Sequence, residues 1–331
     1  MKKIAVFDAK AYDIQWFDKL NKQLGYNFEI KYFEAKLDLD TAIVAKGSDA
    51  VVIFVNDNLN ADVIKKLAEY NIDIVALRCA GFNNVDLAAA KGQIRLYRVP
   101  AYSPNAVAEH TMALLLTLNR RIHRAYNRVR DYNFSLNGLT GFDLKGKTMG
   151  VVGTGKIGQC FIDICLGFGM EVLAYDPYPI DLPNVQYVEL QELFKKSDII
   201  SLHCPLTFEN VHLINKHSLG IMKDGVYILN TSRGALIDSE ALLEAIKTEK
   251  VAGAGLDVYE EESEFFFEDV SASVIHDDIL KLLLSTPNVL VTSHQAFLTE
   301  EALSSIAETT LTNLHDHFKG IQTPNEIVYN E

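Results

Sequence analysis

Residues 147–176, KTMGVVGTGKIGQCFIDICLGFGMEVLAYD, read as a strand, a glycine-rich turn, a helix and a second strand. Residues 149–152 are a short apolar run suited to a buried strand, and apolar residues at helical spacing occupy 157–168 before a second strand-like run at 172–175. The turn between them has GxGxxG spacing, with glycines at Gly153, Gly155 and Gly158. Such a unit is typical of dinucleotide-binding folds.

Each glycine has a separate use in that geometry. Gly153 permits the tight turn, Gly155 lets the backbone approach a pyrophosphate, and Gly158 allows the helix to pack closely on the strand. Asp176 lies at the tip of the second strand, where its carboxylate can accept hydrogen bonds from a ribose diol and would repel a 2′-phosphate. The sequence therefore predicts NAD rather than NADP.

Composition restricts the class of protein. The chain has 331 residues, long enough for two domains, and is 48% hydrophobic and 23% charged, as in a soluble globular protein. The net charge of −13 argues against a nucleic-acid partner. Neither a signal peptide nor an apolar run near the ~20 residues of a membrane span is found. Four scattered cysteines without a CxxC pair favour reduced thiols and a cytoplasmic location: Cys79, Cys160, Cys165 and Cys204.

Strands and helices alternate along the chain, which predicts parallel sheets covered by helices. The predicted strands are 4–7, 28–32, 50–55, 74–77, 94–97, 149–152, 172–175, 198–203, 226–231, 252–257 and 289–292. Helical periodicity marks 61–70, 105–126, 239–247 and 299–318. The long apolar helix 105–126 is expected to be buried between domains or subunits.

We expect an α/β fold of two Rossmann-like or flavodoxin-like parallel-sheet domains separated by an active-site cleft. Two prolines stiffen the segment 98–104, which suggests a domain crossing there. The last helix should return to the first domain, so that the substrate domain is discontinuous, 1–101 with 299–331, and the NAD-binding domain is 102–298.

Polar residues follow three predicted strands of the second sheet. Arg233 could hold a carboxylate through two parallel hydrogen bonds. His294 could exchange a proton near neutral pH. Asp257 and the run 260–262 supply carboxylates, although three adjacent glutamates are also typical of a solvated face. Hydride transfer to a keto acid needs a cation, a proton donor and an acid that keeps the donor charged. No metal-ligand spacing occurs, so the predicted chemistry uses no metal.

Several motifs together resemble the D-2-hydroxyacid dehydrogenase family, and within it the fermentative D-lactate dehydrogenases. The similarity covers most of the chain. The residues that carry it are LRCAG at 77–81, PAYSPN at 100–105, GTGKIG at 153–158, HCPLT at 203–207, NTSRG at 230–234, GLDV at 255–258 and SHQAF at 293–297. The segment 262–269, ESEFFFED, looks like the lactate branch.

The resemblance implies roles for individual residues. Arg233 binds the substrate carboxylate, His294 is the general acid/base, and family spacing selects Glu262 as its carboxylate partner. The backbone amides of Ala80 and Gly81 share the substrate carboxylate. The resemblance also makes Tyr102 and Phe297 pocket residues, with position 298 varying together with Phe297, and makes these residues cofactor-binding: Gly153, Gly155, Lys156, Ile157, Gly158, Asp176, His203, Cys204, Pro205, Thr231, Ser232 and Asp257.

The predicted function is NADH-dependent reduction of pyruvate to D-lactate by a homodimer or a dimer of dimers. Two alternatives remain. The chain could act on bulkier 2-keto acids such as 2-ketoisocaproate or phenylpyruvate, because residues 297 and 298 vary with side-chain preference. It could also be a non-catalytic, NADH-sensing protein resembling the corepressors of this fold, although the presence of Arg233, Glu262 and His294 together weakens that hypothesis.

Overall fold

A computed structural model of the chain describes residues 1–262 and 265–328. The chain divides into two compact units, unit 1 with Met1–Ser103 and Leu298–Glu331, and unit 2 with Pro104–Phe297. The domain limits predicted from the sequence lie within two residues of these boundaries. Residues 263–264 of the segment that resembles the lactate branch, and residues 329–331 of the predicted substrate domain, lie outside the described residues.

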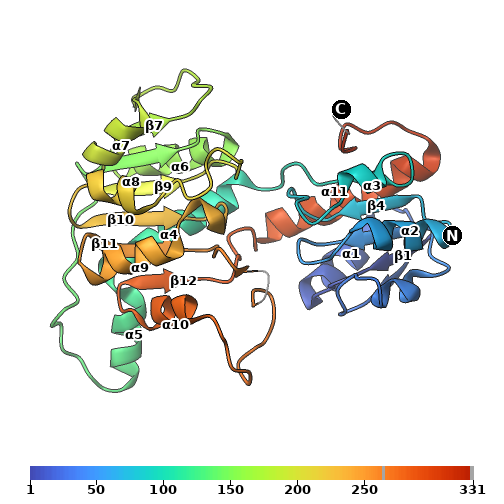
Figure 1. Cartoon of the computed structure of the whole chain (residues 1–331), viewed down its shortest axis with the longest axis horizontal. Helices are drawn as coiled ribbons and strands as arrows, with labels where there is room; N and C mark the ends of the chain where they lie inside the picture. The colour runs from blue at the N-terminus through green and yellow to red at the C-terminus, as the bar shows by residue number, and fades with distance from the viewer. Residues whose placement is uncertain (263–264, 329–331) are drawn as a thin grey trace. The chain divides into compact units, whose positions relative to one another are not determined.

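Unit 1 is a five-stranded parallel sheet in the order β2-β1-β3-β4-β5, the flavodoxin-like arrangement (Figure 1). Its strands are β1 (Lys3–Val6), β2 (Glu29–Tyr32), β3 (Ala50–Ile53), β4 (Ile74–Leu77) and β5 (Arg95–Tyr97). Its helices are α1 (Ala11–Gln23), η1 (Thr41–Ala45), α2 (Ala61–Glu69), α3 (Leu87–Ala90) and α11 (Glu300–Lys319).

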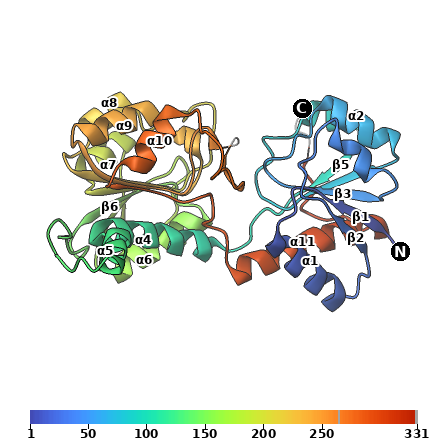
Figure 2. The same cartoon turned by 90° about the horizontal axis from the view of Figure 1, so that it is seen from below.

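The C-terminal helix α11 belongs to unit 1. It begins at the N-cap Thr299, whose side chain accepts a hydrogen bond from the Ala302 N–H. Its buried face, which includes Leu311 and Leu314, shares one apolar core with α1 and the first strands. Figure 2 shows α1 and α11 together on one face of the sheet. Burial of this face therefore fixes the end of the chain on the unit where it begins.

Unit 2 is a seven-stranded parallel sheet in the order β12-β11-β10-β9-β6-β7-β8. Its strands are β6 (Thr148–Val152), β7 (Glu171–Tyr175), β8 (Val185–Tyr187), β9 (Ile199–Leu202), β10 (Val226–Asn230), β11 (Val251–Leu256) and β12 (Val289–Val291). Its helices are α4 (Pro104–Arg120), α5 (Ile122–Arg130), α6 (Lys156–Gly167), α7 (Leu190–Lys196), α8 (Lys216–Ile221), η2 (Gly234–Leu236), α9 (Ser239–Lys247) and α10 (Asp278–Ser285).

The helices of unit 2 cover both faces of this sheet. In Figure 2, α4 and α6 lie on one face and α7 to α10 on the other, each layer with its own apolar core. The strand order reverses between β6 and β9. In doubly wound sheets, ligands bind beyond the carboxyl ends of the strands at this switch point. The predicted class of two parallel-sheet α/β domains is confirmed.

Each predicted strand is present, with ends within two residues of those expected, but the sequence did not predict β8. This strand has three residues at the sheet edge, and its side chains are only partly buried or exposed. Three residues are too few for their alternation to be distinguished from chance, so such a short edge strand gives little sequence signal.

The prediction of one helix over 105–126 was wrong. Arg121 has a left-handed backbone, φ 51°, which separates α4 from α5. The apolar side of α4 is buried inside unit 2, where Leu115 and Leu118 belong to the core shared with α6. The described residues of α5 bury none of their side chains. One side of α4 is therefore buried within unit 2, and the expected burial of this helix between domains or subunits stays a prediction. No described helix combines the length and apolarity needed to cross a membrane.

Candidate active site

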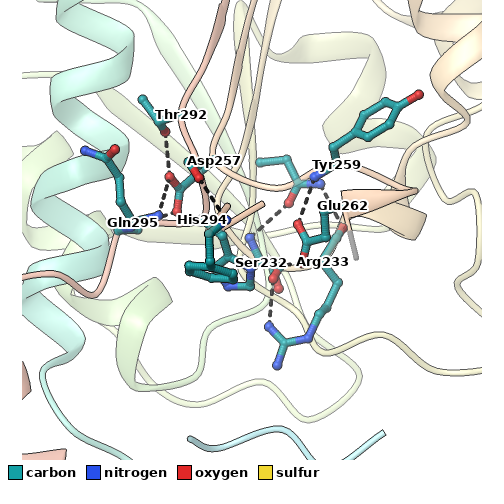
Figure 3. A network of polar contacts seen from close by, with 12 residues as sticks. Ser232, Arg233, Asp257, Tyr259, Glu262, Thr292, His294 and Gln295 are labelled. Atoms are coloured by element: carbon teal, nitrogen blue, oxygen red, sulfur yellow. Dashed lines mark hydrogen bonds and ion pairs between the residues drawn. The ribbon is translucent and has the colours of Figure 1, made fainter. Parts of the chain in front are cut away.

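Three neighbouring strands of unit 2 bring the predicted chemical groups to one edge of the sheet. Strands β10, β11 and β12 are adjacent and parallel. Arg233, Glu262 and His294 follow these three strands in that order, so all lie beyond the same carboxyl edge. Figure 3 shows the three side chains in one close view.

His294 and Glu262 point toward one another and are in contact (Figure 3). His294 Nδ1 lies 2.9 Å from Glu262 Oε1, and Glu262 Oε2 accepts a hydrogen bond from the Tyr259 N–H at 3.0 Å. Both side chains are about one-fifth exposed, at 21% and 23%. Because the carboxylate contacts Nδ1, the imidazole Nε2 is the nitrogen left to exchange a proton with a ligand.

The loop that carries His294 is held by Asp257. His294 has φ 47°, uncommon for a residue with a side chain, and its N–H donates to the Asp257 carbonyl at 2.7 Å. The Asp257 carboxylate accepts from the N–H groups of Gln295 and Ala296 at 2.9 and 2.8 Å, and from Thr292 Oγ1 at 2.5 Å. Asp257 thus holds the backbone of His294 and of the two residues after it, and the side chain of Thr292 before it.

Sequence reasoning did not identify His110 as a member of this network. His110 lies on α4, and its Nε2 is 3.3 Å from Asp257 Oδ1 and 3.1 Å from Thr292 Oγ1. Burial of Asp257 would raise its pKa, but hydrogen bonds from His110, Thr292 and two backbone amides outweigh burial and hold this pKa below its usual value. The available signal was a histidine within a helical stretch rich in Ala, Leu and Met.

Arg233 projects from a turn that Asn230 stabilises. Asn230 Nδ2 donates to the Arg233 carbonyl at 2.9 Å, and its Oδ1 accepts from the Ser232 N–H at 3.0 Å. The Arg233 Nη1 donates to the Ser232 carbonyl at 2.7 Å (Figure 3). Among the described residues, no carboxylate lies within ion-pair distance of this guanidinium. Its remaining N–H groups are therefore available to a ligand carboxylate.

This fold and site have close counterparts among known proteins. A sequence model of the D-isomer specific 2-hydroxyacid dehydrogenase NAD binding domain matches residues 112–296. D-lactate dehydrogenase of Escherichia coli is 54% identical, over 98% of this chain and 100% of that protein. The chain belongs to the D-2-hydroxyacid dehydrogenase family. This confirms the family and the NAD cofactor predicted from the sequence.

Solved structures of the family agree with this assignment. The apo-structure of the Escherichia coli enzyme has a TM-score of 0.91 at 52% identity, covering 98% of this chain and 100% of that one. The pyruvate reductase of Chlamydomonas reinhardtii has a TM-score of 0.93 at 43% identity, covering 98% of both. D-2-hydroxyisocaproate dehydrogenase has a TM-score of 0.88 at 36% identity, covering 98% of this chain and 99% of that one.

The glycine loop of this dehydrogenase makes a tight turn and leaves the start of α6 open. Gly153 has φ 95°, and a Cβ there would lie 2.7 Å from the Cys204 backbone nitrogen. A Cβ on Gly158 would overlap the Gly153 carbonyl. Around the Cβ position of Gly155, which is the N-cap of α6, no described atom lies within 4 Å. The backbone is therefore open to a phosphate at the helix start, where Lys156 and Ile157 also lie.

Asp176 follows β7 and is bound to the glycine loop. Its Oδ2 accepts from the Thr154 N–H at 2.7 Å and from Thr154 Oγ1 at 3.1 Å, and its Oδ1 accepts from the Tyr178 N–H at 2.9 Å. Each carboxylate oxygen has further acceptor capacity. The role of Asp176 in binding a ribose diol stays a prediction, now with a second function in shaping the loop.

His203 lies beneath the same loop, after β9. A Cβ on Gly153 would lie 2.7 Å from the His203 carbonyl carbon. The His203 Nε2 is 2.8 Å from Ser201 Oγ, while its buried Nδ1 has no hydrogen-bond partner among the described residues. Burial lowers the pKa of His203 to about 3. The adjoining Cys204 carbonyl accepts from Ser232 Oγ at 2.5 Å, which connects the segment at Cys204–Pro205 to the turn of Thr231–Arg233.

The buried neutral imidazole of His203 gives a testable pH dependence. Its folded-state pKa lies below the ordinary 6.5, so the unfolded chain takes up the proton first as pH falls. The contribution of the neutral His203 to the unfolding free energy is therefore fully present above pH 6.5 and is lost as the pH falls toward 3. Between pH 7 and 5 we expect a loss of about 2 kcal/mol in unfolding free energy. Urea unfolding at both pH values provides the measurement. The loss of unfolding free energy between pH 7 and 5 should be smaller in His203→Asn than in His217→Asn, a control at an exposed histidine. Equal losses in the two variants would contradict the prediction.

The remaining predicted substrate contacts lie in other segments. Ala80, Gly81 and Tyr102 belong to unit 1, and Phe297 is a buried residue at the end of unit 2. The carbonyls of Ala80 and Gly81 accept from Arg98 Nη1 and from the Cys79 thiol, whereas their N–H groups have no acceptor among the described residues. Two open amides in sequence suit a carboxylate ligand. That all four contact one substrate stays a prediction.

Proposed function

We propose that this dehydrogenase reduces pyruvate to D-lactate with NADH. The observation that carries the proposal is the contact of His294 with Glu262 beside an Arg233 that has no carboxylate partner among the described residues. The segments that follow three adjacent strands thus supply a proton donor, its counter-ion and a cation that can bind a carboxylate. The names of the Escherichia coli and Chlamydomonas relatives support the same substrate.

When NADH is bound, its nicotinamide would supply the hydride for the substrate carbonyl carbon. Arg233 holds the substrate carboxylate in a bidentate contact, and the amides of Ala80 and Gly81 share it. This fixes which face of the carbonyl is presented to the cofactor. His294 donates the Nε2 proton to the carbonyl oxygen, while Glu262 stabilises the imidazolium before transfer and keeps the ring oriented afterward. In the reverse direction the neutral His294 accepts the hydroxyl proton.

A coupled absorbance assay tests the function directly. Purified protein should oxidise NADH when pyruvate is added, and the product should be D-lactate by reaction with stereospecific lactate oxidases. In reverse it should reduce NAD with D-lactate but not with L-lactate. Absence of NADH oxidation with pyruvate, despite measurable NADH binding, would contradict the proposal and favour an NADH-sensing binding protein.

A second candidate activity is reduction of bulkier 2-keto acids. The similarity to D-2-hydroxyisocaproate dehydrogenase supports it, as does the variable pair Phe297 and Leu298. Comparing kcat/KM for pyruvate, 2-ketoisocaproate and phenylpyruvate distinguishes the two, since a higher value for either larger acid would replace pyruvate as the proposed substrate.

Asp176 should make NADH the preferred donor. A 2′-phosphate beside this carboxylate would meet like charge, which costs several kcal/mol, so kcat/KM should favour NADH over NADPH by about 100-fold or more. Asp176→Asn should narrow this ratio while its side-chain oxygen still accepts from the Thr154 N–H. Steady-state kinetics with both cofactors provide the measurement. Equal use of NADH and NADPH by the wild-type protein would refute the role.

We further propose that the enzyme is a homodimer in the cytoplasm. The segment from α5 to residue 136 exposes a series of large apolar side chains, whose exposures are Ile122 52%, Tyr126 60%, Val129 51%, Tyr132 86%, Phe134 69% and Leu136 80%. So many exposed large apolar side chains within 15 residues of sequence suit a surface that a second copy of the chain buries. Four free cysteines suit a reducing compartment.

Light scattering during size exclusion tests the assembly. The wild-type protein should have twice the 37.0 kDa chain mass, or four times for a dimer of dimers. Tyr126→Glu combined with Val129→Glu should shift it to the monomer mass, because charges would enter the proposed contact. Leu39→Glu, at an exposed apolar residue of unit 1, is the control and should leave the mass unchanged. A monomeric wild-type protein would exclude the dimer.

A further inference from the structure

A second imidazole and carboxylate pair lies close to His294 and Glu262 but has no part in the proposed reaction. His212 Nε2 is 2.5 Å from Glu260 Oε1, and Glu260 Oε2 accepts from the Ser239 N–H at 3.4 Å. Of the three adjacent glutamates, Glu260 pairs with His212 and Glu262 with His294. The two pairs are therefore joined through one short turn of backbone.

That turn determines where the Glu262 carboxylate lies. The Tyr259 N–H donates to Glu262 Oε2 at 3.0 Å, and the Glu262 N–H donates to the Tyr259 carbonyl at 3.3 Å. Since Glu262 Oε1 contacts His294, any shift of the Tyr259–Glu260 backbone changes the orientation of the carboxylate that holds the imidazole.

The same backbone packs against the turn that carries Arg233. A Cβ on Gly234 would overlap the Tyr259 carbonyl and would lie 2.5 Å from the Glu260 nitrogen. The residue directly after Arg233 therefore has to be glycine for this approach. The next residue, Ala235, accepts a hydrogen bond from the His212 N–H at 2.8 Å. His212 is thus bound to the turn of Arg233 by its backbone and to the turn of Glu262 by its side chain.

The backbone of His212 is itself held in place. It has φ 54°, in the left-handed region, and its carbonyl accepts from Asn215 Nδ2 at 2.8 Å. Because these bonds hold the backbone of His212, loss of the contact with Glu260 is expected to free the Glu260 turn more than the backbone of His212.

We propose that His212 and Glu260 are positioning residues, whose contact holds Arg233 and Glu262 in register for the proposed reaction. This inference rests on the proposed function. Small displacements of groups that orient a substrate can cost about 100-fold in rate, whereas a partly exposed ion pair contributes about 0–1 kcal/mol to stability. The pair should therefore affect turnover far more than folding.

Kinetics of His212→Ala and Glu260→Ala test the pair. Each should lower kcat/KM for pyruvate by about 10- to 100-fold with NADH affinity and Tm nearly unchanged, and the double variant should lose no more than either single one. Glu260→Gln should recover most activity, because its amide oxygen still accepts from the imidazole. The matched control is Lys223→Met at the opposite sheet edge. It breaks an ion pair with Asp198 whose side chains are 41% and 31% exposed, compared with 41% and 25% for His212 and Glu260.

A second measurement is independent of turnover. The His294 ring proton bound to Glu262 should give a low-field NMR signal, to be assigned by its loss in His294→Gln. In Glu260→Ala this signal should weaken through faster exchange with water, and in Lys223→Met it should remain. Wild-type kcat/KM and an unchanged His294 signal in Glu260→Ala would overturn the inference. If the wild-type protein does not reduce pyruvate, the proposed function fails, and the NMR signal alone then decides whether the pair positions His294.

Discussion

Replacing His294 with Gln is expected to lower kcat for pyruvate reduction by about 10³-fold while leaving NADH affinity nearly intact. General acid catalysis by a placed side chain contributes about 10²- to 10⁴-fold. Glutamine can still donate a hydrogen bond but has no acidic proton to transfer. The glycine loop and Asp176, which are the proposed cofactor contacts, belong to other segments of unit 2, so stopped-flow turnover and NADH fluorescence titration should separate the two effects.

Two further variants make this prediction specific. Glu262→Gln keeps an acceptor for His294 Nδ1 but removes the charge, so its loss of kcat should be smaller than that of His294→Gln. His217→Gln changes an exposed histidine at the start of α8 and should be silent. Comparable losses of NADH affinity and turnover in His294→Gln would mean that the residue supports the fold of the site rather than proton transfer.

The common sheet edge of the candidate site could be predicted from local sequence patterns because parallel strands impose a simple geometry. Apolar runs located the strands, and residues after neighbouring parallel strands must share one edge of the sheet. Arg233 and His294 were found this way. The glycine spacing was informative because positions such as Gly153, with φ 95°, suit few residue types, and Asp176 was predicted from its place at the end of the second strand of that unit.

Long-range side-chain contacts were not predictable in the same way. The residues alone did not decide which of Glu260, Glu261 and Glu262 would meet His294; family spacing selected Glu262, and the structure has that contact. His110 lies on α4 and contacts Asp257, which is far from it in the sequence, and no local sequence pattern indicates a contact over such a separation. No glycine or proline marks the break between α4 and α5 in the sequence. The left-handed backbone of Arg121 that makes this break is seen only in the structure.

The second large effect is expected at Arg233. Arg233→Lys should raise the KM for pyruvate by about 10- to 100-fold and change kcat much less, because lysine keeps the charge but cannot form two parallel hydrogen bonds to a carboxylate. Arg233→Gln should be more severe, since it removes the charge as well. Steady-state kinetics at saturating NADH give both constants. NADH affinity, measured separately, should be unchanged in both variants.

A substrate that lacks the carboxylate tests directly whether Arg233 binds that group. Pyruvamide keeps the ketone but has no negative charge for Arg233 to bind, so wild-type protein should reduce it poorly. If Arg233 binds the carboxylate, the substitution Arg233→Lys should lower kcat/KM far less for pyruvamide than for pyruvate. The contact between Arg233 and the carboxylate is already absent when pyruvamide is the substrate. A similar proportional loss with both substrates would mean that Arg233 acts on the carbonyl or on the shape of the turn stabilised by Asn230, and an unchanged pyruvate KM would remove its proposed role altogether.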